Sequence, residues 1–322
     1  MKKTISILLS VCLLLSLTFE TTALSFYDEN SLNSYELYII KTEGKLLKKT
    51  DSEIAKTILA KLGMSQKTIK LLKEEILNEI LNSESITKTT QYCRLSEDGI
   101  EQHITKKEYE ESVAFDKTNL AEHIKSVEQY SYNGSDSYFI KDLYIYKTQN
   151  APNGTYGIIS DYDWKNFTGT YRGKDVLSLS GENLIFDKSS FCLAVEFSAA
   201  EQFNGVLTSV TETDYMDSTT NPSDIIQSAY AIACKYNLPS NVYGSTYSFT
   251  YTDASFVIVC RARIQQYTLP CTFNVYSNYF HQRIFLVGSF SISVSGASVS
   301  VSPQLSYWNM QIATTSPISY TP

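Results

Sequence analysis

The sequence predicts an α+β protein, with an N-terminal helical hairpin region followed by a mainly antiparallel, sandwich-like β body that contains one inserted helix. Three observations support this fold class. Charged residues crowd the first part of the chain, with 34 among residues 26–130 and four among residues 236–322. That charged part has apolar residues at helical spacing. From about residue 130, apolar and polar residues alternate with the period of two that is typical of strands.

Residues 1–25 have the pattern of a secretory signal peptide. A basic start precedes an uncharged apolar core over 5–17, and small residues stand at Ala23 and Ser25. The apolar core is shorter than the ~20 residues that a membrane-spanning helix needs. We therefore expect a secreted, extracellular protein whose mature chain starts near Phe26 and contains no transmembrane helix.

The charged region 26–130 is predicted to be mainly helical. Residues 50–53 match a capping box, Gly63 is suited to end the helix that follows, and Ser65 can cap a second helix that runs to Leu81. Further on, the Asp98-Gly99 pair predicts a two-residue turn between two strands. A second capping box over 105–108 predicts another helix.

Residues 131–322 are predicted to form a β-rich domain. Strands are expected at 176–180 and 184–186, joined as a hairpin by a Gly-Glu-Asn turn. One helix is expected near 222–235, because Asn221 precedes a proline at the first helical position. Its apolar stripe would be Ile225, Ile226, Ala229, Tyr230 and Ala233.

The clearest strand pair lies within 286–302. A turn at Gly296-Ala297 sets Ser295 opposite Ser298 and Val294 opposite Val299. One face is then all serine, and a one-residue slip would mix the two faces. The other face is apolar and is made of Phe290, Ile292, Val294, Val299 and Val301. This hairpin could insert into a membrane, or it could belong to the half-buried sheet of a sandwich.

Two acids beside aromatic residues form the candidate binding site. Asp161 and Asp163 would point to the same face of a strand, about 7 Å apart, with Trp164 adjacent. Paired carboxylates at such a distance suit glycoside hydrolysis, but they suit solvated loop acids equally well. Tyr276 and Tyr279, in the charge-poor region, could add aromatic contact area.

The remaining composition excludes several classes of function. The predicted mature chain carries 25 basic and 33 acidic residues, a net charge of −8, whereas nucleic-acid binding needs a basic face. No zinc, phosphate-loop or dinucleotide motif is present, so we expect no cofactor and no metal. Cys260 and Cys271 flank a proline-containing turn and could form a disulfide, or be buried thiols.

The strings Leu62-Gly63-Met64-Ser65 and Tyr171 to Ser180 resemble uncharacterised exported proteins of low-GC Gram-positive bacteria. The resemblance implies export and a low-GC Gram-positive source, but no catalytic residue.

Our leading hypothesis is therefore a non-enzymatic exported protein of unknown molecular function that binds a cell-wall or other surface polymer, or self-associates. The alternatives are a membrane-active, toxin-like protein that inserts the 286–302 hairpin, and a secreted hydrolase that acts on carbohydrate.

Overall fold

The protein is mainly antiparallel β structure with a few short helices. The computed structural model describes residues 21–26, 33–40, 52–96, 101–114, 137–148, 154–165, 174–203, 206–238, 249–282, 291–295, 298–302, 307–314 and 317–322. Within these ranges, no helix is long and apolar enough to cross a membrane.

The largest sheet joins nine of the described strands in the order β1-β2-β3-β5-β6-β12-β8-β9, with β4 paired to β3. All of its pairings are antiparallel. Its strands are β1 (Thr21–Phe26), β2 (Asn33–Ile40), β3 (Ser83–Leu95), β4 (Glu101–Ile104), β5 (Ser137–Thr148), β6 (Thr155–Lys165), β8 (Leu184–Phe203), β9 (Val206–Asp217) and β12 (Phe249–Ile264).

A second sheet of five strands has the order β10-β11-β7-β14-β17. Its strands are β7 (Lys174–Gly181), β10 (Ile225–Gln227), β11 (Ala231–Asn237), β14 (Val275–Gln282) and β17 (Tyr307–Ala313). Two short pairs complete the β structure: β13 (Cys271–Phe273) with β18 (Ile318–Tyr320), and β15 (Ser291–Ser295) with β16 (Ser298–Ser302).

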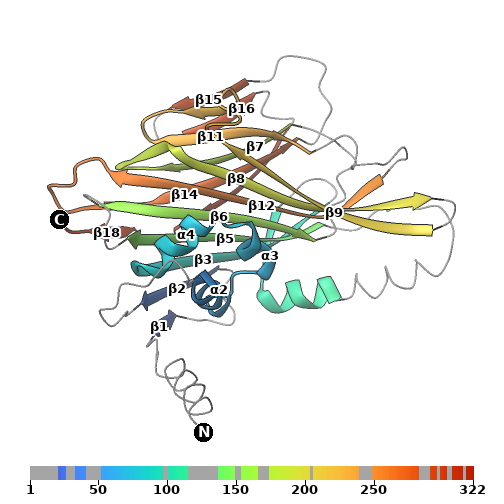
Figure 1. Ribbon diagram of the computed structural model, residues 1–322, viewed down its shortest axis with the longest axis horizontal. Helices are drawn as coiled ribbons and strands as arrows, with labels where there is room; N and C mark the ends of the chain where they lie inside the picture. Colours follow the sequence, from blue (N-terminus) through green and yellow to red (C-terminus); the bar gives the residue numbers. More distant parts are fainter. Residues whose placement is uncertain are drawn as a thin grey trace, which may run out of the picture.

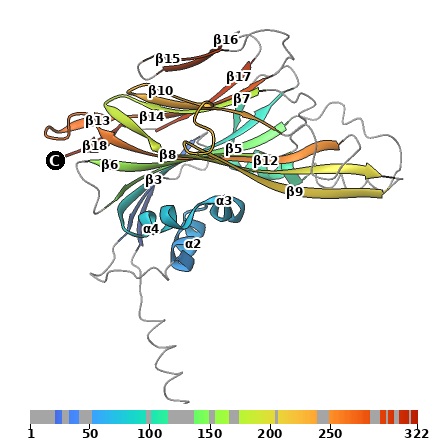
Figure 2. The ribbon, with the colours of Figure 1, turned by 45° about the horizontal axis from the view of Figure 1, so that its top comes forward.

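These elements are stacked in layers, which Figure 2 shows from the side. The five-stranded sheet packs on one face of the nine-stranded sheet, and the main core lies between them, with Phe139 and Phe256 facing Leu177 and Tyr279. The helices α2 (Ser52–Lys61), α3 (Gln66–Leu71) and α4 (Glu74–Leu81) cover the other face of the large sheet (Figure 1). Their apolar residues pack against Tyr144, Tyr146, Ile159, Val257 and Val259.

The region 26–130 is less helical than predicted, because it supplies β2, β3 and β4 as well as the helices. Gly63 has a left-handed φ of 76° after α2, and Ser65 caps α3 by accepting a hydrogen bond from the Thr68 backbone. The predicted second helix is interrupted at Leu72 and Lys73, so a simple helical hairpin is not confirmed.

The capping box at Thr105 and Glu108 is confirmed. The Thr105 backbone N–H donates to the Glu108 carboxylate, and the Glu108 N–H donates to the Thr105 hydroxyl. A helix follows over the described residues 106–114.

Residues 21–25, predicted to belong to the signal peptide, form most of the edge strand β1. This strand pairs only with β2 among the described residues. Cleavage at the predicted position would therefore remove β1 and leave β2 as the edge of the sheet, with the pairing of all the other strands unchanged.

The helix predicted near 222–235 is wrong, because this segment forms strands β10 and β11. Strand β11 is buried on both faces. Ile232 and Cys234 point into the main core, while Ala233 packs with the β15–β16 hairpin. A strand covered on both sides needs no alternation of apolar and polar residues, and its continuous apolar run resembles the apolar stripe of a helix in the sequence.

The hairpin predicted across 176–186 is also wrong. Strand β7 ends at Gly181 in the five-stranded sheet, whereas β8 begins at Leu184 in the nine-stranded sheet. The turn does lie where predicted, with Asn183 at a φ of 60°. The chain crosses there between the two sheets, so both strands contribute apolar residues to the core between them.

The register predicted for the last hairpin is confirmed, with Ser295 opposite Ser298 and Ile292 opposite Val301. The hairpin forms its own two-stranded sheet and lies over the outer face of the five-stranded sheet (Figure 2). Val299 and Val301 contact Val176, Ala233 and Phe280 there.

The Tyr146 ring lies close against Gly157, and this contact allows the packing on the helix-covered face of the large sheet to be tested. Tyr146 is the partner of Gly157 across β5 and β6, and a Cβ at position 157 would lie 1.9 Å from the tyrosine ring. That ring cannot swing away, because it is buried and its hydroxyl donates to Glu79. We expect Gly157→Ala to lower the free energy of unfolding by about 1–3 kcal/mol, measured by urea denaturation.

In a Tyr146→Leu background the same substitution should cost clearly less, because the obstructing ring is gone. An equal loss of stability in both backgrounds would contradict this packing.

Candidate functional site

A small cavity lies between the α3–α4 junction and the β8–β9 end of the nine-stranded sheet. Its volume is about 150 Å³. The sheet supplies an apolar floor through Val257 and Val259, and the junction supplies a wall that includes Lys73. The rest of the lining is largely polar and contains the hydroxyl-bearing residues Ser189, Ser190, Ser218 and Thr219.

Strand register brings further groups to this cavity. Cys192 of β8 is paired with Asp217 of β9, and Ala194 is paired with Tyr215. Directly paired residues of antiparallel strands point to the same face of the sheet, which here is the face that carries the helices. Tyr215 therefore stands beside the cavity, and its side chain is 48 % exposed.

Lys73 and Asp217 form an ion pair in the cavity lining, with 3.5 Å between Nζ and Oδ2. The backbone N–H groups of Thr220 and Thr219 each donate to Asp217 Oδ1 at 2.9 Å and lower the pKa of Asp217. The Cys192 sulfur and the Asp217 carboxylate raise the pKa of Lys73. Both partners are partly exposed, and such pairs contribute at most about 1 kcal/mol, so they remain available to a ligand.

The cavity also contains the Cys192 thiol. Burial raises the pKa of this thiol above its ordinary value, so it is protonated at neutral pH. A protonated thiol is a poor nucleophile. The groups around the cavity therefore suit non-covalent binding of a small polar unit better than covalent catalysis.

The site residues that the sequence predicts lie on different faces of their strands in the structure. Asp161 and Asp163 lie on the helix-covered face of β6, whereas Trp164 points to the opposite face and is buried between the sheets. Trp164 stacks on Phe139 and meets Tyr279 edge-on, so two of the predicted aromatic residues belong to the core. Tyr276 and Tyr279 lie on opposite faces of β14, and Tyr276 is partly exposed.

Asp161 is 3 % exposed and lies beneath α3. The Thr68 hydroxyl donates to its Oδ2 at 2.5 Å, and Ser255 donates to its Oδ1 at 3.4 Å. Asp142 lies directly opposite in the register of β5 and β6. Burial raises the pKa of Asp161 to about 8. This buried acid is held within the helix–sheet layer, out of reach of a polysaccharide.

The other predicted residues are distributed as follows. Cys260 is buried and lies near Ser190, Cys271 is partly exposed on β13, and both are free thiols in the structure. The hairpin residues Ile292, Val294, Val299 and Val301 lie on β15 and β16, while Phe290 is outside the described residues.

The cavity residues were missed by reasoning from the sequence because they are brought together by the fold. Lys73 and Asp217 are 144 positions apart. The available signal was weak: an acid followed by a Ser-Thr-Thr turn, with a tyrosine two positions before it on the same face of the strand.

No family model matches the chain, and no curated protein matches it. A collagen-binding domain from a Staphylococcus aureus adhesin is 13 % identical over 38 % of this chain and 75 % of that domain, with a TM-score of 0.23. Clostridium perfringens delta-toxin is 9 % identical over 73 % of this chain and 89 % of its own, with a TM-score of 0.18.

The Clostridium perfringens NetB toxin in its membrane-inserted form is 6 % identical over 59 % of this chain and 90 % of its own, with a TM-score of 0.17. At these TM-scores the likenesses carry no argument about this protein.

Asp161 gives the protein a measurable pH dependence of stability. Its pKa rises from 3.8 to about 8 on folding, so the folded state keeps a proton that the unfolded state loses above about pH 4. The stability contributed by this proton is complete below that pH and falls by up to about 1.4 kcal/mol per pH unit towards pH 8. Asp161→Asn, which has no such proton, should therefore gain stability relative to the wild type as pH rises.

The free energy of urea unfolding would be compared at about pH 5 and about pH 7. The exposed Asp214→Asn is the matched control and should follow the wild type. If the difference between Asp161→Asn and the wild type is the same at both pH values, this account of Asp161 is wrong.

Proposed function

We propose that the protein is an exported, non-enzymatic binding protein that holds a sugar unit of a surface polymer in the cavity beside β9. The observation that carries the proposal is the combination of an apolar floor, a hydroxyl-bearing lining and an exposed tyrosine on one face. A sugar ring presents both hydroxyl groups and C–H faces, and it needs both kinds of contact. Tyr215 supplies a flat amphipathic surface next to the charged groups Lys73 and Asp217.

The size of the cavity supports one small unit as the ligand. Sites for drug-sized ligands measure roughly 300–1,000 Å³, and this cavity measures about 150 Å³. A polymer would then place one residue in the cavity and run on across the surface past Tyr215. A wall polymer repeats such a unit many times, so it would offer many equivalent binding positions along its length.

The edge of the large sheet favours polymer binding over self-association. Strand β9 has β8 as its one strand partner among the described residues. Its sequence carries Glu212, Asp214 and Asp217, and charges on an edge strand discourage the addition of a strand from another molecule. Self-association of the protein through β9 is therefore less favoured than the binding of a polymer.

The binding proposal predicts that Tyr215→Ala weakens retention on cell-wall material about tenfold, because it removes the exposed aromatic contact. Sedimentation of the protein with purified Gram-positive cell walls measures this directly. Tyr267→Ala is the matched control, since Tyr267 is also exposed, at 39 %, but lies in the turn after β12. Equal retention of both variants, each with wild-type thermal stability, would contradict the proposed site.

The β15–β16 hairpin supports a second candidate, a membrane-active protein. Val299 and Val301 of its aliphatic face pack on the five-stranded sheet, but the hairpin has no strand partner outside itself among the described residues, so it could detach without breaking another ladder. Each of its strands has five described residues, whereas a transmembrane strand needs about 9–11.

Release of a trapped dye from lipid vesicles tests this second candidate. If the hairpin inserts, Ile292→Asp on the aliphatic face should abolish release, while Ser293→Asp on the serine face should retain it. A burial cost of several kcal/mol for a lipid-facing charge is the reason for the difference. Wall binding without any leakage from the vesicles would exclude the membrane candidate.

A further inference from the structure

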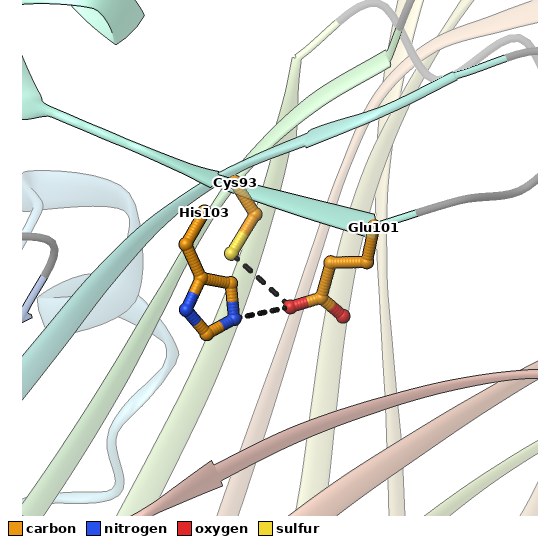
Figure 3. Close-up of side chains that lie close together, drawn as sticks. All are labelled: Cys93, Glu101 and His103. Atoms are coloured by element: carbon orange, nitrogen blue, oxygen red, sulfur yellow. Dashed lines mark hydrogen bonds and ion pairs between the residues drawn. The ribbon is translucent and has the colours of Figure 1, made fainter.

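A cluster of three metal-ligating side chains lies on the β3–β4 hairpin. Cys93 is directly paired with His103, and Glu101 precedes His103 by two residues on the same strand. Paired residues and residues two apart share one face of a sheet, so the three side chains converge (Figure 3). The His103 Nε2 lies 3.0 Å from Glu101 Oε1, and the Cys93 Sγ lies 3.4 Å from the same oxygen.

One ligand atom from each of these residues lies within 4.8 Å of the others. Cys93 is buried, Glu101 is partly exposed and His103 is exposed, so the cluster runs from the interior to the surface. An ion could therefore reach it from the side of His103.

The surroundings of the cluster are polar although they are buried. Lys141 of β5 is fully buried, and its Nζ donates at 2.6 Å both to Glu101 Oε1 and to the backbone carbonyl of Gln311 on β17. Gln91 lies opposite Lys141 and two residues before Cys93 on β3. It is 8 % exposed, and its Oε1 has no hydrogen-bond partner among the described residues.

The cluster contains more than the Lys141–Glu101 ion pair. Lys141 donates to Glu101 and to the Gln311 carbonyl and also interacts with the Cys93 thiol, while His103 pairs with Glu101. Among the described residues, the buried Gln91 oxygen is an acceptor without a donor, and burying such a group costs free energy unless water or a ligand satisfies it. A water bound to an ion in this cluster would provide that donor.

We propose that Cys93, Glu101 and His103 bind a divalent transition metal, with Zn²⁺ as the best match. A thiolate, an imidazole and a carboxylate are the ligand types that Zn²⁺ uses, and three protein ligands leave a fourth position for water. The mixed set of sulfur, nitrogen and oxygen is poorly suited to Ca²⁺ or Mg²⁺, which take oxygen ligands. This site is independent of the cavity beside β9.

Binding exchanges one proton for the metal. The Cys93 thiol gives up its proton to solvent as the S–M bond forms, so that M²⁺ and the thiol yield a thiolate–metal unit and H⁺. Glu101 turns from accepting the Cys93 and His103 hydrogen bonds to ligating the ion. Lys141 keeps the Gln311 carbonyl and balances part of the negative charge of the two anionic ligands.

Titration of the purified, reduced chain with Co²⁺ tests the site, because Co²⁺ bound to a thiolate gives a charge-transfer absorption band that free Co²⁺ lacks. We expect one equivalent of Co²⁺ to produce the band and Zn²⁺ to abolish it by competition. Cys93→Ser should eliminate the band, whereas Cys271→Ser, which alters a partly exposed thiol on β13, should keep it. His103→Ala should weaken the affinity at least about tenfold.

Absence of the band in the wild type would overturn the proposal, and so would a band that survives Cys93→Ser. If Cys93→Ser does not fold, the exposed His103→Ala variant decides. Wild-type Co²⁺ affinity in that variant would overturn the site, and a tenfold or larger loss would support it.

Discussion

Strand β6 is buried on both faces over the nine residues from Tyr156 to Trp164, and the rest of the molecule depends on that double burial. Apolar surface removed from water is the main driving force of folding, so each face of this strand and its neighbours needs its own cover. The five-stranded sheet covers one face. Helices α2 to α4 cover the other, with their apolar residues against Tyr146, Ile159 and Val259.

Covering both faces also buries polar groups, which must then find partners inside the protein. Asp161 meets Thr68 of α3, and Asp142 accepts from Thr90 and Tyr144. Between the sheets, Asp175 accepts from Tyr279 and lies 2.8 Å from the His281 ring nitrogen. Three of the predicted site residues, Asp161, Trp164 and Tyr279, are thus part of these buried layers. The candidate binding groups lie instead near the β9 edge of the large sheet, where the cavity lies between the helices and the sheet.

Features set by neighbouring residues could be predicted from the sequence, such as the serine and aliphatic faces of the last hairpin and the cap at Thr105. Features set by tertiary pairing could not, as β11 illustrates. The cluster of Cys93, Glu101 and His103 shows that a shift of one residue in strand register decides which side chains meet. A two-residue turn at Asp98-Gly99 would pair Cys93 with Ile104, but the structure pairs it with His103. That shift of one residue moves His103 to the other face, beside Cys93.

Amide hydrogen exchange, followed with and without soluble fragments of the wall polymer, tests the central claim most directly. Because residues 156–164 of β6 and 254–260 of β12 are buried, their amides should exchange only through global unfolding, with or without the fragments. Added fragments should slow exchange in residues 71–76 and 189–194 and around Tyr215, and leave β15 and β16 unchanged. Fast exchange in β6, or protection confined to β15 and β16, would contradict the account.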